Sequence, residues 1–296
     1  MVRNVMQQAN ILFTPLAASL NTQGIKGRIT CHSIYSKAIN LCVGENKLLT
    51  IQRTGQGISP FGIVLTEDEF LYLADELSPG QVGEINHQGI IFGALNIALP
   101  KRYLDLQVQT NGEVRRECFF RSVAQSGGET GLYGDLAQAL QTPLNSELIE
   151  IQRRIIYWLE GETVSWEDLI GKGPGLTPSM DDTLIGILLM IYSDCRLAQR
   201  LQQSDFFTAE EFRHLDKLTT IVSVNYLQCA AQGVFSTPLL HLSRAICGYS
   251  VSDEIKTKRR VEQILSLGHH SGADTLLGVG LVCLALNEYI NKPYIK

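Results

Sequence analysis

The chain has 296 residues, with 25 Lys or Arg against 30 Asp or Glu, so its formal net charge at pH 7 is −5. Without a cluster of basic residues, this balance lacks the electrostatic footprint of proteins that bind nucleic acid or an anionic membrane, and we expect neither partner. Hydrophobic residues make up 45% of the chain and charged residues only 19%, which excludes a mainly disordered protein and is sufficient for a full core.

The cysteines and the apolar segments indicate a cytoplasmic protein. The seven cysteines are odd in number and have no CxxC spacing, which is typical of free thiols in a reducing compartment. The first twenty residues do not have the pattern of a signal peptide. The most apolar stretches, 183–192 and 276–286, are too short to span a bilayer. We therefore expect a cytoplasmic location and no membrane partner.

The first part of the chain has the pattern of an antiparallel β domain. Short runs rich in Ile, Val, Leu, Phe and Thr are separated by Gly, Asn and Pro, as is typical of strands and turns. One helix is expected at 66–77, because Thr66 and Glu69 have the spacing of a capping box. We predict a β barrel or sandwich over residues 1–125. The expected strands are 27–34, 37–44, 47–53, 61–65, 89–99, 103–109 and 117–123.

After residue 126 the apolar residues recur at helical spacing, which predicts an α-helical domain over 126–296. The fold class expected for the whole chain is therefore α+β, with the β domain first. The expected helices are 134–141, 146–159, 181–201, 209–231, 239–247, 253–267 and 272–289.

The second domain contains an internal repeat. Residues 179–187, SMDDTLIGI, align without a gap on residues 271–279, SGADTLLGV. Each copy predicts a helix start in which Ser is the N-cap and Asp, three residues later, closes a capping box. The glycine one turn further on allows a close approach between helices. We expect the two helices to pack together with their N-termini at one site.

The segments before each copy favour a site for a small anion. A glycine-rich loop, 171–178, leads into the first helix, and Gly268-His269-His270 leads into the second. A helix N-terminus has free N–H groups and a partial positive charge, so two adjacent N-termini would suit a phosphate or carboxylate. The loop does not end in the Lys-Ser/Thr of a Walker motif, so ATP binding is not supported. The predicted substrate-binding residues are Lys172, Gly173, Gly175, Thr177, Ser179, Asp181, His270, Ser271 and Gly272.

The predicted catalytic residues are Asp182, Asp274 and His269, and each also has a structural interpretation. The aspartates are either helix caps alone or groups that position or deprotonate a nucleophile, and their occurrence in two copies favours a function. His269 is either a loop histidine or a general base. The adjacent carboxylates of Asp181 and Asp182 point about 100° apart on a helix and have no third ligand nearby, so we expect no metal and no other cofactor.

These motifs resemble a known family. The segment 175–182 followed by Gly186, together with 268–278, is similar to the small third subunit of bacterial oxamate carbamoyltransferase, and 32–41 is similar to that family's N-terminal signature. The resemblance extends from about residue 27 to 289. One departure is Met180, which stands where the pattern has Gly and whose side chain would narrow the mouth of the loop.

The resemblance implies a subunit that acts with two larger subunits in allantoin degradation. The implied reaction converts oxalurate and phosphate into oxamate and carbamoyl phosphate, and all of these are small anions. An amide nitrogen is a poor nucleophile, so a base such as Asp182, Asp274 or His269 would be needed. Two alternatives remain open at this point: a non-catalytic structural subunit, and a metal-dependent hydrolase that uses Asp181, Asp182 and Asp274.

Overall fold

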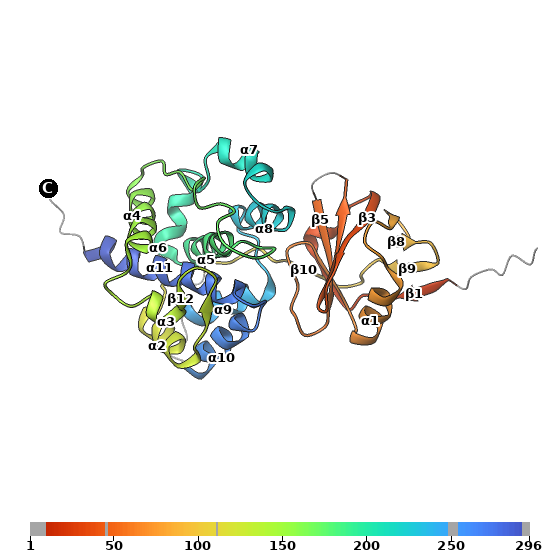
Figure 1. The fold of residues 1–296 in the computed structure, drawn as a ribbon, viewed down its shortest axis with the longest axis horizontal. Helices are drawn as coiled ribbons and strands as arrows, with labels where there is room; N and C mark the ends of the chain where they lie inside the picture. The colour runs from red at the N-terminus through yellow and green to blue at the C-terminus, as the bar shows by residue number, and fades with distance from the viewer. Residues whose placement is uncertain (1–9, 45–46, 111, 248–253, 292–296) are drawn as a thin grey trace, which may run out of the picture. The chain divides into compact units, whose positions relative to one another are not determined.

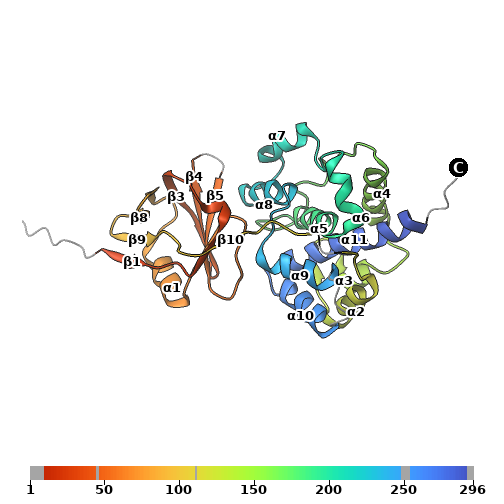
Figure 2. The ribbon, with the colours of Figure 1, turned by 180° about the vertical axis from the view of Figure 1, so that it is seen from behind.

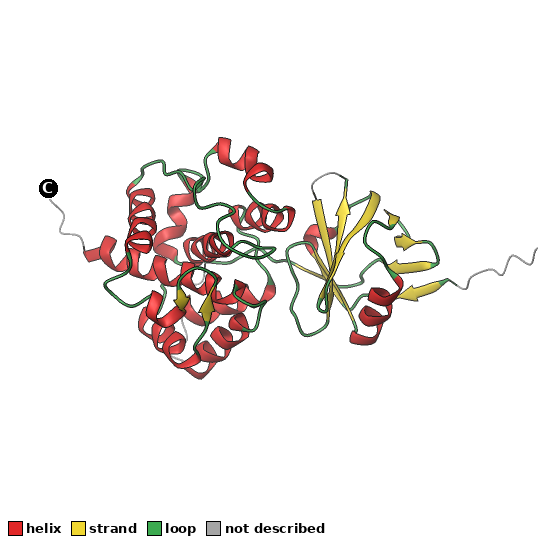
Figure 3. Cartoon of the chain, in the orientation of Figure 1, coloured by secondary structure: helices red, strands yellow, loops and turns green. Residues whose placement is uncertain are grey.

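The structure is a computed structural model that describes residues 10–44, 47–110, 112–247 and 254–291. The chain forms two compact units, residues 1–106 and 107–296 (Figure 1). Strands dominate the first unit and helices the second, as Figure 3 shows in yellow and red. The expected α+β class is therefore confirmed. The division between the units falls at Leu106 and Gln107, whereas the sequence placed it at 125.

The first unit is a curled, mixed sheet of ten strands in the order β1-β9-β8-β7-β3-β4-β5-β6-β2-β10. Most neighbouring strands are antiparallel, but three pairs are parallel: β1 with β9, β2 with β10 and β5 with β6. The sheet is therefore mixed rather than purely antiparallel. The strands are β1 Ile11–Phe13, β2 Ala17–Ser19, β3 Gly27–Ile34, β4 Ala38–Val43, β5 Lys47–Arg53, β6 Gly62–Leu65, β7 Val82–Asn86, β8 Gly89–Phe92, β9 Leu95–Ala98 and β10 Tyr103–Leu104.

Some expected strands form with the predicted bounds and others do not: of the expected strand 103–109, only Tyr103–Leu104 forms one, as β10. The bounds of β3 and β5 are those expected. The run 89–99 forms two strands, because Gly93 adopts a positive φ of 61° and turns the chain. The segment expected as a strand at 117–123 is instead part of helix α2, Arg116–Ser126, which buries Phe119, Ser122 and Val123 at helical spacing. That correction removes the last strand expected in the β domain.

Helix α1, Glu67–Glu76, packs against β5 and closes one side of the sheet's core. Thr66 and Glu69 form the expected capping box at its N-terminus. Phe70 and Leu73, one turn apart, are both buried in the same core as the inward-facing residues of the sheet. A short 3₁₀ helix, Leu20–Thr22, connects β2 toward β3.

The second unit is mostly helical, with a small hairpin between α2 and α3. Two expected helices are each interrupted where a polar side chain caps a new helix. The first breaks at Asp194, whose side chain caps α6, and the second breaks at Thr219 and Thr220, where Thr220 caps α8. The elements are β11 Glu129–Thr130, β12 Gly134–Asp135, α3 Leu136–Ala139, α4 Ser146–Glu160, α5 Ser179–Ser193, α6 Cys195–Ala198, a 3₁₀ turn Gln199–Gln202, α7 Ala209–Leu218, α8 Ile221–Ala231, α9 Thr237–Cys247, α10 Glu254–Leu265 and α11 Ser271–Asn291. Residue 253, the expected start of α10, lies outside the described residues.

Helices α5 and α11 form the centre of the second unit, where the views from both sides show them crossing (Figures 1 and 2). Nearly every residue of α5 is buried, and so are most residues of α11 up to Leu286, whereas residues 287–290 are exposed. By length and composition alone the segment Ser271–Ile290 could cross a membrane, which corrects the expectation that this apolar stretch is too short. In the structure 72% of its most apolar window is buried inside the protein, as in a core helix.

Candidate functional site

The two repeat copies meet, as expected, at the crossing of α5 and α11. Gly186 in the first copy lies against the backbone of Thr275 in the second, and Gly278 lies against the backbone of Thr183. Thr183 Oγ1 also donates to the carbonyl oxygen of Asp274 at 3.2 Å. Because both contacts involve the first two turns of each helix, the helix N-termini lie side by side.

The aspartates of the repeat do not cap their helices, which corrects the expected capping boxes. Helix α5 begins at Ser179, its N-cap is Pro178, and no side chain makes a capping hydrogen bond. Helix α11 likewise begins at Ser271. Helix α5 therefore starts two residues before the expected position 181 and α11 one residue before the expected position 272, and Asp182 and Asp274 occupy the fourth helical position. Their carboxyl groups are directed to other segments of the chain.

The carboxyl group of Asp182 lies between the two helix starts. It accepts a hydrogen bond from Thr177 Oγ1 at 2.9 Å, and the same Thr177 hydroxyl is 3.0 Å from Ser271 Oγ in the second copy. Asp182 is only 7% exposed. Burial raises its pKa well above the usual value for an aspartate, and hydrogen bonds from Thr177 and Ser271 only partly oppose this rise. The site therefore favours the neutral form of this group.

Asp274 has the matching position in the second copy. It is 1% exposed, and its Oδ1 accepts a hydrogen bond from the backbone N–H of Gly131 at 2.9 Å. Burial raises its pKa, while the Gly131 N–H, the neighbouring Ser179 hydroxyl and the charge of His270 act in the opposite direction. Asp182 is thus next to the serine of the second copy, and Asp274 is next to the serine of the first.

Ser179 has a buried hydroxyl at this junction. The residue is 1% exposed, and among the described residues no group meets its Oγ with the distance and angles of a normal hydrogen bond. Gly131 leaves room for it, since a Cβ on Gly131 would lie 2.0 Å from Ser179 Oγ. A buried hydroxyl without a full partner is costly, which makes it a candidate to contact a substrate.

The hairpin formed by β11 and β12 covers the junction, and the sequence reasoning missed it. Besides Gly131, it contributes Tyr133, whose hydroxyl donates to Glu147 Oε2 of α4 at 3.1 Å. Lys172 of the glycine-rich loop forms an ion pair with the same carboxylate. Lys172 and Tyr133 together lower the pKa of Glu147, and burial is the main cause of the raised pKa of Tyr133. The glycines at 127, 128, 131 and 134 were the available sequence signal for a close loop here.

The two histidines before α11 have different positions. His270 Nδ1 is 2.9 Å from the carbonyl oxygen of Glu129, so this nitrogen carries a proton. His269 Nδ1 lies 2.8 Å from His270 Nε2 and can donate to it when the His270 ring is neutral. His269 itself is exposed, and no contact among the described residues joins it to Asp182 or Asp274. His270 is thus the histidine closer to the site.

Asp181 has a different environment from its neighbour Asp182. It is fully buried, its Oδ1 accepts from the N–H of Gly171 at 2.8 Å, and its Oδ2 accepts from Thr219 Oγ1. Burial raises its pKa. Asp181 therefore joins the glycine-rich loop to the connection between α7 and α8. In the part of the chain that the structure describes, no three His, Cys, Asp or Glu residues are grouped as metal ligands.

The loop 171–178 is shaped by glycines. Gly173 and Gly175 both have a positive φ of 107°, which favours glycine, and a Cβ on Gly173 would lie 2.8 Å from that of Ser179. Met180 is 1% exposed, so its side chain enters the core and does not narrow the mouth of the loop as expected. Gly272 also has a packing role, because a Cβ there would lie 2.0 Å from the carbonyl oxygen of Ile264 in α10.

Several N–H groups at the helix starts already have backbone partners. The N–H of Met180 donates to the carbonyl of Lys172 at 3.0 Å, and that of Gly272 donates to Leu267 at 3.1 Å. The sequence predicted a site made of free N–H groups. The groups that converge in the structure are instead the side-chain hydroxyl groups and the carboxyl groups, and it is the carboxyl groups that have raised pKa values.

The fold defines a class of protein in which a β unit is followed by a helical unit with two repeated helix starts side by side. The polar groups at these helix starts are hydroxyl groups and carboxyl groups whose raised pKa values favour the neutral form. Comparison with protein families specifies it further. Residues 7–107 match the AllH family N-terminal domain, and residues 169–283 match oxamate carbamoyltransferase subunit AllH. Because these matches cover most of the chain, it belongs to the oxamate carbamoyltransferase subunit AllH family. No solved structure matches the chain.

Proposed function

We propose that this subunit binds the carbamoyl substrate where α5 and α11 meet, and that Asp182 and Asp274 transfer protons there. The observation that carries the proposal is the pairing of two buried carboxyl groups with raised pKa values, one from each repeat copy. Family membership supports the reaction, since it makes the chain a subunit of a carbamoyltransferase that works in a multi-subunit complex.

The charge state of the aspartates decides whether an anion can bind. Oxalurate, oxamate and carbamoyl phosphate are all anionic, and two ionised aspartates at the junction would repel them. A neutral carboxyl group instead donates a hydrogen bond to a carboxylate or phosphate oxygen. The buried hydroxyl of Ser179, which has no hydrogen bond of normal geometry among the described residues, supplies another donor. Lys172 is already paired with Glu147, so its charge is partly compensated.

The same neutral carboxyl groups suit the chemical step. When phosphate attacks the carbamoyl carbon of oxalurate, a C–O bond to phosphate forms and the C–N bond to the oxamate nitrogen breaks. That nitrogen must receive a proton as it leaves, and hydrogen phosphate loses one, so the net reaction is balanced. A carboxyl group with a raised pKa can give the proton to nitrogen and recover it from phosphate. In the reverse direction it acts as the base for the oxamate amide.

The partner subunits and the location of the chain belong to the same proposal. The chain would act with two larger subunits in the cytoplasm, within the degradation of allantoin. Around the junction, the chain has only two short segments, loop 171–178 and the hairpin of β11 and β12. The partners would therefore supply the remaining substrate contacts.

The experiment is turnover of the reconstituted complex with Asp182→Asn and Asp274→Asn. Asn retains the size of Asp but neither gives nor takes the proton. For at least one variant we expect turnover to fall by roughly 10²-fold or more, with little change in the melting temperature of the isolated chain. Asp216→Asn, on the exposed face of α7, is the matched control with normal turnover.

A structural subunit is the second candidate. The hydrogen bonds of the two aspartates connect them to loops of their own chain, Thr177 to Asp182 and Gly131 to Asp274, as those of purely structural groups would. Near-normal turnover in both variants would favour this candidate and contradict the catalytic one.

A further inference from the structure

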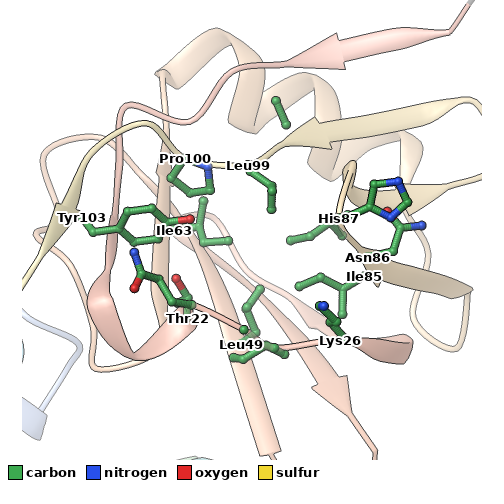
Figure 4. Close-up of a pocket in the computed structure, with 15 residues that line it drawn as sticks. Thr22, Lys26, Leu49, Ile63, Ile85, Asn86, His87, Leu99, Pro100 and Tyr103 are labelled. Atoms are coloured by element: carbon green, nitrogen blue, oxygen red, sulfur yellow. The ribbon is translucent and has the colours of Figure 1, made fainter.

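A hollow lies within the β unit (Figure 4). Its volume is about 250 Å³. The hollow has an apolar floor formed by Leu49, Ile63 and Ile85, which are at most 5% exposed. Three connections form its rim: the segment between β2 and β3, the turn between β7 and β8, and the chain between β9 and β10.

The rim carries polar groups without partners. Lys26, His87 and Tyr103 line the hollow, and the structure gives none of their side chains a hydrogen bond or an ion pair among the described residues. Figure 4 shows Tyr103 across the hollow from Lys26 and His87. The β3–β7 ladder reaches Gly27 and Ile85, which places Lys26 beside the β7–β8 turn. Donors from separate connections thus surround one apolar space.

The charge of the lining is opposite to that of the chain. No Asp or Glu is among the residues that line the hollow, whereas the protein as a whole has a net charge of −5. The ammonium group of Lys26 is therefore the only full charge at the rim when His87 is neutral. The ammonium group would repel a cation, and a neutral molecule would form no ion pair with it.

We propose that this hollow binds a small organic carboxylate, with its apolar body against Leu49, Ile63 and Ile85 and its carboxylate at Lys26. An engineered apolar cavity of about 150 Å³ holds benzene, so the size of this hollow suits a ring or branched chain of comparable bulk. Tyr103 and His87 donate hydrogen bonds to the same carboxylate or to a second polar group. This site is independent of the function proposed for the helical unit.

The test is binding of benzoate to the full chain by titration calorimetry, with benzyl alcohol as the uncharged probe of similar shape. We expect saturable benzoate binding that is tighter than that of benzyl alcohol. Lys26→Met retains the aliphatic stem but removes the charge, and should weaken benzoate binding at least about tenfold, the change expected for a lost charge-assisted hydrogen bond. Lys37→Met, exposed and outside the lining, should leave it unchanged.

A further variant tests the apolar part of the hollow. Ala98→Leu places extra methyl groups in the hollow and should weaken both probes. If a variant does not fold, the comparison of benzoate with benzyl alcohol on the unaltered chain still applies. Absence of saturable benzoate binding, equal affinity for the two probes, or equal effects of Lys26→Met and Lys37→Met would each overturn the proposal.

Discussion

Gly186 and Gly278 make reciprocal contacts at the crossing of α5 and α11. A Cβ on Gly186 would lie 2.0 Å from the carbonyl oxygen of Thr275, and a Cβ on Gly278 would lie 2.0 Å from that of Thr183. These pairs are equivalent under the 92-residue repeat. The repeat therefore has a local two-fold character in space, and this contact is what brings Asp182 and Asp274 to one junction.

Gly186→Ala and Gly278→Ala should each destabilise the protein by about 2–3 kcal/mol, because a backbone carbonyl cannot give way without separating the helices. In an unhindered helix the same change would add stability. Gly280→Ala on α11 is the matched control, since the three atoms nearest to its Cβ would all belong to the side chain of Leu140 and not to the backbone. Chemical denaturation measures all three, and an equal effect of Gly280→Ala would contradict the explanation.

The buried aspartates should make stability depend on pH. Burial raises the pKa of Asp181, Asp182 and Asp274 in the folded state. Their contribution to stability is therefore full below the unfolded pKa, near 4, and is lost as the pH rises through the raised values. The lowered pKa values of Glu147 and Asp168 act in the opposite direction, but these groups are more exposed.

Asp182→Asn removes one of these titrations. The free energy of unfolding of the variant, relative to that of the unaltered chain, should therefore be higher at about pH 7 than at about pH 4. Denaturant unfolding at several pH values gives the difference in the free energy of unfolding. A difference that is constant with pH would show that Asp182 does not have a raised pKa.

Asp194→Ala should destabilise the helical unit by about 3 kcal/mol, because it removes a fully buried carboxylate that pairs with the partly exposed Arg196 and accepts backbone hydrogen bonds. The Asp194 side chain is fully buried, accepts from the N–H of Val114 at 2.8 Å and pairs with Arg196 at 2.7 Å. Glu113→Ala, which removes the exposed partner of Arg196, should cost less than about 1 kcal/mol. Similar losses in the two variants would contradict the buried role of Asp194.

The purified chain should carry no stoichiometric divalent ion, because no third carboxylate or histidine lies at ligand spacing from Asp181 and Asp182. Elemental analysis of protein prepared without chelator tests this. A content of about one equivalent would return the metal-dependent hydrolase to consideration.

Local patterns in the sequence determined much of this protein. The runs of apolar and β-branched residues at 27–34 and 47–53 predicted β3 and β5, and the spacing of Thr66 and Glu69 predicted the capping box of α1. The repeat predicted that α5 and α11 pack through Gly186 and Gly278, and its residues indicated the family. These features depend on neighbours within a few turns, or on a repeated pattern, so they are visible without coordinates.

Only the tertiary structure decided what the polar residues of the repeat contact. The capping boxes expected from Ser179 and Ser271 do not form. Asp274 instead accepts from Gly131, 143 residues away, and Thr177 bonds to Asp182 while contacting Ser271. A short-range cap and a long-range partner compete for the same side chain, and burial favours the partner that lies between the packed segments. No local pattern records which distant segment arrives there, because the folding of the whole helical unit determines it.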